Sequence, residues 1–225
     1  MHVYDQLAHN DPVLSRMLKW RENTVDSHII KEVYFDKSYE IVRAVHVGDV
    51  VVDAGAHIGV FTLKASLQAG EKGKVYAFEP EPENFSYLKL NTKSLQNVEI
   101  FETALWSSEG SKTLYQVADN TGGHRLYPFS EFKSTVPVQT TRLDSVVNRR
   151  VDFFKIDVEA SELEVLKGAK HILQNYSPFI SMEVHNTELV KNVTFFLLEY
   201  GYKLDCSHLA TAANNTYGLI YAEKK

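Results

Sequence analysis

The stretch Val50–Gly59, with the sequence VVVDAGAHIG, constrains the fold of this chain more than any other. Its apolar start ends in an acid, and small residues then lead through a sharp turn into the amphipathic stretch Val60–Leu67. A second apolar run, Lys74–Phe78, ends in another acid, Glu79. This order predicts a strand, a tight turn, a helix and a second strand, which together form the first half of a nucleotide-type βαβ unit.

Downstream of this unit, apolar runs keep alternating with stretches of helical periodicity. The expected further strands are 98–103, 152–157 and 179–184, and the expected helices are 60–69, 82–94, 161–173 and 188–200. The last two runs, 202–206 and 217–221, are joined by a Thr- and Asn-rich loop without a helical pattern, so we expect an antiparallel pair. The predicted fold is α/β and Rossmann-like: a seven-stranded, mostly parallel sheet with helices on both faces and an antiparallel last pair.

The length fits one sheet domain with a short appendage. The chain has 225 residues, and 44% of them are hydrophobic, which is enough for a single buried core. We expect residues 1–45 to form an N-terminal helical appendage or lid, and residues 46–225 to form the Rossmann-like domain. Within the appendage, Asp11 and Pro12 are typical of a helix start, and Lys31–Phe35 is expected to be irregular or a short strand.

Charge and apolar patterning exclude several classes of protein. The net charge is −5, and no run of Lys and Arg exceeds two residues, so we expect no nucleic-acid partner. No apolar run approaches the ~20 residues that span a bilayer. The N-terminus shows no secretory signal, so a cytoplasmic location is expected. The single cysteine, Cys206, excludes an internal disulfide and a multi-cysteine metal cluster.

Polar residues end the predicted strands, and the carboxyl ends of parallel strands meet at one crevice. These residues are Asp53, Glu79, Thr103, Asp157 and Glu183. The first turn has neither Gly-Lys-Ser/Thr nor a complete Gly-x-Gly-x-x-Gly motif, and a carboxylate there would repel a pyrophosphate. Acids at both strand ends instead favour a ligand with an ammonium group and ribose hydroxyls, such as S-adenosylmethionine. A nicotinamide dinucleotide is the weaker alternative.

Five segments in a fixed order resemble one protein family. They are DAGAHIGVFT at 53–62, AFEPEPENF at 77–85, TRLD at 141–144, FKIDVE at 154–159 and MEVH at 182–185. Together they look like the FkbM family of S-adenosylmethionine-dependent methyltransferases, a class I, Rossmann-like family, over residues 48–185. Two positions depart from its pattern: His57 stands where the family usually has Asn, and Ala160 where Gly usually follows.

The resemblance implies transfer of a methyl group from S-adenosyl-L-methionine, which becomes S-adenosyl-L-homocysteine. The acceptor it implies is a hydroxyl on a sugar, polysaccharide or secondary metabolite. It further implies that the cofactor contacts the first turn, the end of the second strand and the residues after the third strand. The expected cofactor-binding residues are Asp53, Gly55, Ala56, His57, Gly59, Glu79, Pro80, Thr103, Ala104 and Leu105.

The fourth and fifth strands carry the expected catalytic residues. Strand alternation puts Lys155, Asp157 and Glu159 on one side, so both carboxylates face the crevice. There they would hold hydroxyls, bind a divalent cation or act as a base, although Glu159 would also suit a helix start. Glu183 and His185 repeat the spacing, and His185 is the preferred general base because a free imidazole titrates near neutral pH. An ordinary structural histidine is the alternative.

The long loop of residues 115–137 is the other segment expected to contact the substrate. His124 and Arg125, next to paired glycines in the long loop of residues 115–137, are expected to contact the substrate, unless the glycines form an ordinary turn. No metal ligands are assigned, but a metal-dependent O-methyltransferase would use Asp157 and Glu159. A non-catalytic S-adenosylmethionine-binding homologue is a further alternative, and the sequence leaves a homodimer open.

Overall fold

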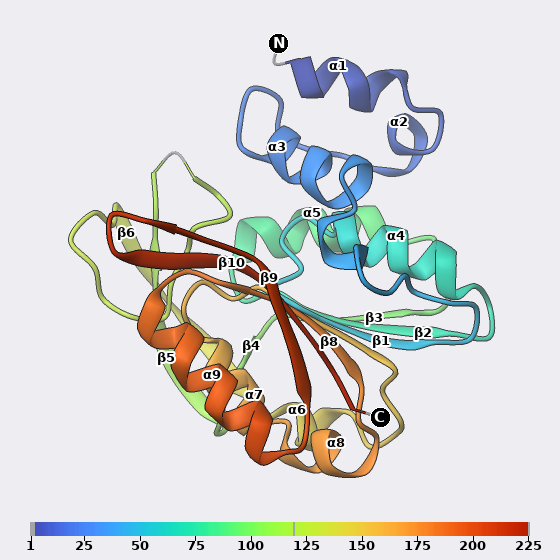
Figure 1. The fold of residues 1–225 in the computed structure, drawn as a ribbon. Coiled ribbons are helices and arrows are strands. Elements are labelled where there is room, and N and C mark those ends of the chain that lie inside the picture. The colour runs from blue at the N-terminus through green and yellow to red at the C-terminus, as the bar shows by residue number, and fades with distance from the viewer. Residues whose placement is uncertain (1–2, 119, 225) are drawn as a thin grey trace.

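The computed structural model describes residues 3–118 and 120–224. Its main element is a seven-stranded sheet in the order β3-β2-β1-β7-β8-β10-β9 (Figure 1). The strands are β1 (Val50–Ala54), β2 (Lys74–Phe78), β3 (Val98–Phe101), β7 (Phe153–Ile156), β8 (Phe179–Val184), β9 (Lys203–Ala212) and β10 (Asn215–Glu223). The first five pair in parallel, and β10 is antiparallel to β8 and β9. The predicted fold class is confirmed.

Helices cover both faces of this sheet (Figure 1). On one face lie α4 (Val60–Ala69) and α5 (Pro82–Thr92), and on the other lie α6 (Leu143–Val146), α7 (Glu162–Lys167), α8 (Lys170–Asn175) and α9 (Thr187–Glu199). Successive strand residues point to opposite faces. Accordingly, Val51 and Phe153 belong to the core under α4, whereas Val52 and Phe154 belong to the core under α7 and α9. Strands buried on both sides explain the near-continuous apolar runs in the sequence.

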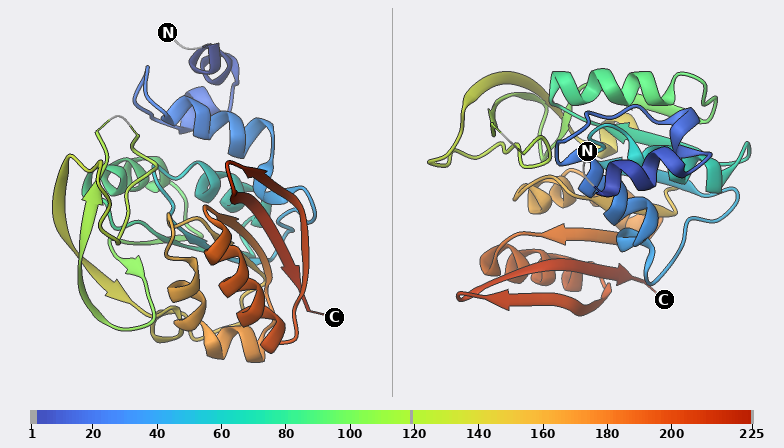
Figure 2. Two further views of the ribbon diagram at one scale, coloured as in Figure 1. Left: turned by 60° about the vertical axis from the view of Figure 1, so that its left-hand side comes forward. Right: turned by 90° about the horizontal axis from the view of Figure 1, so that it is seen from above.

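The N-terminal segment consists of short helices stacked beyond α4 at one end of the molecule (Figure 2). They are α1 (Val3–Asn10), α2 (Leu14–Met17), α3 (Asp26–Ile30), a π-helical turn (Lys31–Phe35) and a 3₁₀ turn (Ser38–Glu40). Lys31–Phe35 is therefore helical, and the expectation of an irregular or strand segment is wrong. Ile30 and Val33 are buried at helical spacing, and Lys64 of α4 donates to the Val33 carbonyl at 2.9 Å, which fixes the turn.

The helix expected over 161–173 is interrupted. It forms two short helices, α7 and α8, separated at Gly168. A Cβ on Gly168 would lie 2.0 Å from the Trp106 carbonyl oxygen, so glycine permits a close approach of two backbones. The second helix has its own start, because the Asp144 carboxylate accepts from the backbone N–H groups of His171 and Ile172. The apolar periodicity of residues 161–173 does not reveal a helix cap whose side chain comes from another segment of the chain.

A second, three-stranded sheet was not expected. It has the order β4-β6-β5, from β4 (Ala104–Leu105), β5 (Gly110–Gln116) and β6 (Ser134–Thr141). Most residues of β5 and β6 are at least partly exposed, so they lack the apolar pattern of the main sheet. The β9–β10 hairpin at the sheet edge is also longer than expected (Figure 2). Its turn is only Ala213 and Asn214, both with positive φ.

None of the helices in the described part of the chain is long and apolar enough to cross a membrane.

Candidate active site

A cleft opens where the carboxyl ends of β1 and β7 meet, at the point where the strand order reverses. The space between its walls, with the open solvent at its mouth included, is about 900 Å³. Predicted site residues that line it are Gly55, Ala56, His57, Glu79, Pro80, Ala104, Leu105, His124, Asp157 and Glu159. Predicted site residues outside this lining are Asp53, Gly59, Thr103, Arg125, Glu183 and His185.

The turn after β1 is shaped by left-handed backbone. Gly55 has φ +75°, and a Cβ there would lie 1.8 Å from the Asp157 carbonyl oxygen, so glycine lets the end of β7 pass directly beside the turn. His57 has φ +52°. Asn and His are both enriched at such positions among residues with side chains. The backbone therefore accommodates His57 where the resembling family usually has Asn.

Asp53 turns inward rather than toward the cleft. It is fully buried, accepts from the Thr62 hydroxyl at 2.6 Å, and its Oδ1 lies 3.2 Å from Lys155 Nζ. Lys155 also donates to the Gly55 carbonyl at 2.6 Å, and it lines the cleft itself. The charge of Asp53 is thus neutralised inside the protein. Asp53 does not face the cleft, which differs from the expectation that it contacts the cofactor. The signal for Lys155 was a lysine inside the apolar run FFKI, since buried lysines are almost always paired.

Glu79 presents a fixed carboxylate to the cleft. Its two oxygens accept from the backbone N–H groups of Glu81 (2.9 Å) and His57 (2.8 Å). The side chain is buried, and this burial raises the pKa of Glu79 to about 7. Each oxygen keeps a further lone pair, so the carboxylate can accept from hydroxyls of a ligand.

Two other expected cofactor residues have structural roles. Gly59 is the N-cap directly before α4, and a Cβ there would lie 2.8 Å from Leu88 Cδ1, so its small size lets α4 pack against α5. The Thr103 hydroxyl donates to the Gln139 carbonyl at 2.9 Å and so links β3 to the small sheet. Its neighbours Ala104 and Leu105 do line the cleft, where they form an apolar wall with Phe78, Leu114 and Leu126.

A hydrogen-bond network joins the N-terminal segment to the first turn. Arg21 forms a bidentate pair with the buried Asp26, with donor–acceptor distances of 2.9 and 3.0 Å, and donates to the Asn84 side-chain oxygen at 2.7 Å. His57 Nε2 lies 3.1 Å from the Thr121 hydroxyl, which donates to Asp26. Sequence analysis missed Arg21, Asp26, Asn84 and Thr121. Arg21 and Asp26 are only five positions apart, but their contacts to Asn84 and Thr121 span 63 and 95 positions and leave no local pattern.

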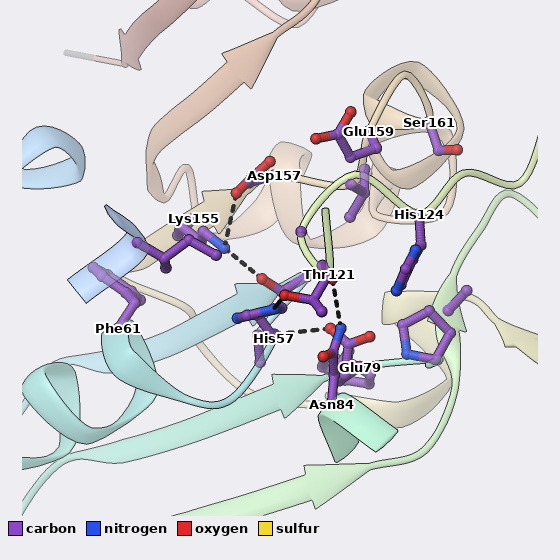
Figure 3. Close-up of a pocket in the computed structure, with 18 of the residues that line it drawn as sticks. His57, Phe61, Glu79, Asn84, Thr121, His124, Lys155, Asp157, Glu159 and Ser161 are labelled. Carbon is purple, nitrogen blue, oxygen red and sulfur yellow. Dashed lines mark hydrogen bonds and ion pairs between the residues drawn. The ribbon is translucent and has the colours of Figure 1, made fainter. Parts of the chain in front are cut away.

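The opposite side of the cleft is acidic, and Figure 3 shows Asp157 and Glu159 across from His57 and Glu79. The Tyr39 hydroxyl lies 2.9 Å from Asp157 Oδ2 and 3.0 Å from Glu183 Oε2. Burial, with the nearby Asp157 charge, raises the pKa of Glu183 to about 8. Tyr39 is the donor toward both carboxylates, and its one hydroxyl proton is shared between them. The structure brings Asp157, Glu159 and Glu183 together; Tyr39 was not anticipated.

His185 is surrounded by carboxylates. Its Nε2 lies 3.8 Å from Asp157 Oδ1, 3.9 Å from Glu159 Oε2 and 3.8 Å from Glu162 Oε1. Burial lowers the pKa of His185, but these three carboxylates outweigh the effect and raise it to about 10. The imidazole is therefore charged at neutral pH, which conflicts with the expected titration near 7 and with a role as proton acceptor in this state.

The two expected loop residues, His124 and Arg125, lie differently with respect to the cleft. His124 lines the cleft, and its Nδ1 accepts from the Val117 N–H at 3.0 Å. Arg125 points its Nε to 3.6 Å from Glu159 Oε2 instead of lining the cleft. Glu159 and Ala160 both have positive φ (+51° and +73°). The second value explains why glycine suits position 160, since alanine there costs about 1–2 kcal/mol.

Comparison with known proteins agrees with these features. A family profile described as "Methyltransferase FkbM domain" matches residues 53–204. Methyltransferase sdnD of Sordaria araneosa is 28% identical, with the alignment covering 73% of this chain and 72% of sdnD. Hexuronic acid methyltransferase AglP of Haloferax volcanii is 32% identical, over 67% of this chain and 62% of AglP. 2-O-methyltransferase NoeI of Sinorhizobium fredii is 25% identical, over 62% of this chain and 65% of NoeI.

Solved structures share the fold. Methyltransferase FkbM from Methylobacillus flagellatus KT superimposes with a TM-score of 0.60 at 16% identity, over 95% of this chain. This chain spans half the length of that protein (50%). Aeropyrum pernix fibrillarin in complex with S-adenosyl-L-methionine gives a TM-score of 0.54 at 15% identity, over 83% of this chain and 71% of fibrillarin. At 15–16% identity, these comparisons show a shared arrangement of strands and helices.

His57 makes the fold sensitive to acid. Burial lowers its pKa from 6.5 to about 4, so the folded state resists protonation of this imidazole. The neutral His57 imidazole therefore makes its full contribution to the free energy of unfolding above pH 6.5. As the pH falls toward 4, this free energy decreases by up to about 3 kcal/mol. We predict that wild type loses stability relative to His57→Asn over this interval in urea unfolding. His171→Asn, at an exposed position, is the control. A constant gap between wild type and His57→Asn would contradict this prediction.

Proposed function

The chain belongs to the FkbM family of S-adenosylmethionine-dependent methyltransferases, and from this premise we propose that it methylates a hydroxyl oxygen of a sugar, glycan or secondary metabolite. The observation that carries the proposal is one cleft with two chemically different sides. One side holds the fixed carboxylate of Glu79 beside an apolar wall, and the other holds the carboxylates of Asp157 and Glu159. The names of AglP and NoeI, a hexuronic acid methyltransferase and a 2-O-methyltransferase, support a carbohydrate hydroxyl as acceptor.

The Glu79 side of the cleft fits an adenosyl group. Glu79 would accept from the two ribose hydroxyls, and the wall that includes Phe78 and Leu105 would cover an aromatic base. His57 Nδ1 is buried in the lining and has no hydrogen-bond partner among the described residues, which leaves it for a polar group of the ligand. The bound cofactor supplies a methyl group on a sulfonium. Asp53 supports the turn through Lys155 and Gly55.

The acidic side would hold the acceptor. Asp157 and Glu159 line the cleft, so either carboxylate would accept the hydroxyl hydrogen bond and orient the oxygen. When the oxygen gains a methyl group it loses its proton, and a positioned carboxylate is the group that receives it. Glu183 and His185 lie outside the lining and act through Asp157: Glu183 by way of Tyr39, His185 as its positive neighbour. We therefore place them as positioning residues rather than catalytic ones.

The N-terminal segment would act as one wall of the cleft. Ile29, Glu32, Val33 and Tyr39 line it, and Arg21 ties the segment to His57 and Asn84. This arrangement supports the lid role expected for residues 1–45, of which the structure describes 3–45. A lid that contacts the cofactor turn excludes water from the cleft, which strengthens the electrostatic interactions inside it.

Donor binding tests the Glu79 side. Calorimetric titration should show that wild type binds S-adenosylmethionine and does not bind NAD. Glu79→Gln should bind S-adenosylmethionine about 10- to 100-fold more weakly, because hydrogen bonds to a charged group contribute about 1.5–3 kcal/mol. Glu99→Gln, at an exposed position on β3, is the matched control and should bind like wild type. Binding of NAD, or an unchanged affinity in Glu79→Gln, would refute the donor assignment.

Acceptor chemistry tests the acidic side. We expect labelled methyl from S-adenosylmethionine to appear as a methyl ether when methyl glycosides of hexoses and hexuronic acids are offered, with the product identified by mass spectrometry. Asp157→Asn and Glu159→Gln should each lower kcat about 10²- to 10⁴-fold while donor affinity stays within about threefold. Glu188→Gln, exposed at the start of α9, should retain full activity. Methylation at nitrogen or carbon, or normal turnover in both variants, would disprove the assignment.

A further inference from the structure

Asp157, Glu159 and His185 each direct one potential ligand atom toward a common point beside the cleft. These three atoms all lie within 4.8 Å of one another. His185 Nε2 is 3.8 Å from Asp157 Oδ1 and 3.9 Å from Glu159 Oε2. Such separations are too long for hydrogen bonds. They exceed by about half an ångström the roughly 3.0–3.4 Å that separates neighbouring ligand atoms around a cation with bonds of about 2.1 Å, so a small inward rotation of the side chains would bring them to that spacing.

A fourth side chain supplies an independent observation. Glu162 is fully buried, its Oε1 lies 3.8 Å from His185 Nε2, and its Oε2 has no hydrogen-bond partner among the described residues. His185 Nε2 is likewise buried without such a partner. Leaving buried polar atoms without hydrogen bonds destabilises a folded protein. Three carboxylates therefore surround one imidazole nitrogen, and nothing in the described chain makes a hydrogen bond with that nitrogen.

The backbone holds Glu159 in place for this role. Glu162 Oε1 accepts from the backbone N–H groups of Val158 (3.4 Å) and Ala160 (3.2 Å). These bonds stabilise the two left-handed residues, Glu159 and Ala160, and so fix the direction of the Glu159 side chain. Glu162 is thus a positioning residue for the cluster, while the other three side chains offer the ligand atoms.

We propose that Asp157, Glu159 and the neutral imidazole of His185 bind a divalent transition-metal cation such as Mn²⁺, and that the cation displaces the Nε2 proton of His185 to solvent. Two carboxylates and one imidazole form a mixed set of oxygen and nitrogen ligands. Mg²⁺ and Ca²⁺ prefer oxygen ligands alone, so this set suits Mn²⁺ and other first-row transition metals better. Asp157 and Glu159 line the cleft, so the remaining coordination positions open toward the acceptor.

The cation has a defined task in the reaction, and this part rests on the proposed function. The acceptor oxygen would bind the cation, which would make its O–H group more acidic. A lone pair of that oxygen forms the new C–O bond as the C–S bond of the donor breaks, and the sulfur keeps the electron pair. Asp157 and Glu159 would each give one oxygen to the cation, and the second oxygen of Glu159 would remain free to receive the hydroxyl proton.

Binding of Mn²⁺ alone tests the site without any turnover. The wild-type chain, stripped with EDTA and exchanged into buffer, is titrated with MnCl₂ and the free ion is followed by electron paramagnetic resonance. We expect one ion per chain, with at least tenfold weaker binding in Glu159→Gln and His185→Gln. Glu188→Gln and His171→Asn are the matched controls and should bind like wild type. Absence of saturable binding by wild type, or unchanged binding in both ligand variants, overturns the proposal.

Two further measurements separate this proposal from the proposed function. S-adenosylmethionine affinity, measured for each variant, should remain near the wild-type value and shows that the variant is folded. Methyl transfer by wild type should fall at least tenfold in EDTA and return when MnCl₂ is added in excess. Full turnover in EDTA would overturn the proposal that the reaction needs a bound cation, and would leave the methyltransferase assignment intact. Mn²⁺ binding in a chain that does not bind S-adenosylmethionine supports the site and refutes the proposed function.

Discussion

The ion pair between Asp53 and Lys155 is the interaction on which the cleft depends. It joins β1 to β7, the two strands between which the strand order reverses, and both side chains are buried. Removing one partner of such a pair leaves an uncompensated charge and costs about 3–5 kcal/mol. Lys155 also donates to the Gly55 carbonyl and lies 3.7 Å from Asp157. One ammonium group therefore connects the turn proposed to bind the donor with the acids proposed to bind the acceptor.

Around this pair, each side of the cleft is fixed by a different kind of contact. On the Glu79 side, backbone N–H groups hold the carboxylate, and the Arg21–Asp26 pair holds the N-terminal segment against His57. On the other side, charge dominates: Lys155 and His185 face the carboxylates of Asp157 and its neighbours. These contacts are the basis for proposing a ribose diol at Glu79 and an acceptor hydroxyl at Asp157 and Glu159.

Sequence reasoning succeeded where the signal was local or topological. Strands buried on both faces are continuous apolar runs, and the ends of parallel strands must meet, so the meeting of Glu79 with Asp157 and Glu159 was predictable. It failed where partners come from distant segments. Tyr39 reaches Asp157 across 118 positions, and the pKa of His185 depends on Glu162, which no motif marks as its neighbour. In the small sheet, β6 does alternate between inward and outward residues, but only Val136 and Val138 on its inward side are apolar, so the signal is weak.

The dependence of the cleft on its central ion pair is measured most directly by a double-mutant cycle on Asp53→Asn and Lys155→Met. Urea unfolding gives the free energy of unfolding of wild type, both single variants and the double variant. Each single change should cost about 3–5 kcal/mol, and the double change should cost at least about 1.5 kcal/mol less than their sum, because it leaves no unpaired buried charge. Additivity within about 0.5 kcal/mol would contradict a structural role for the pair.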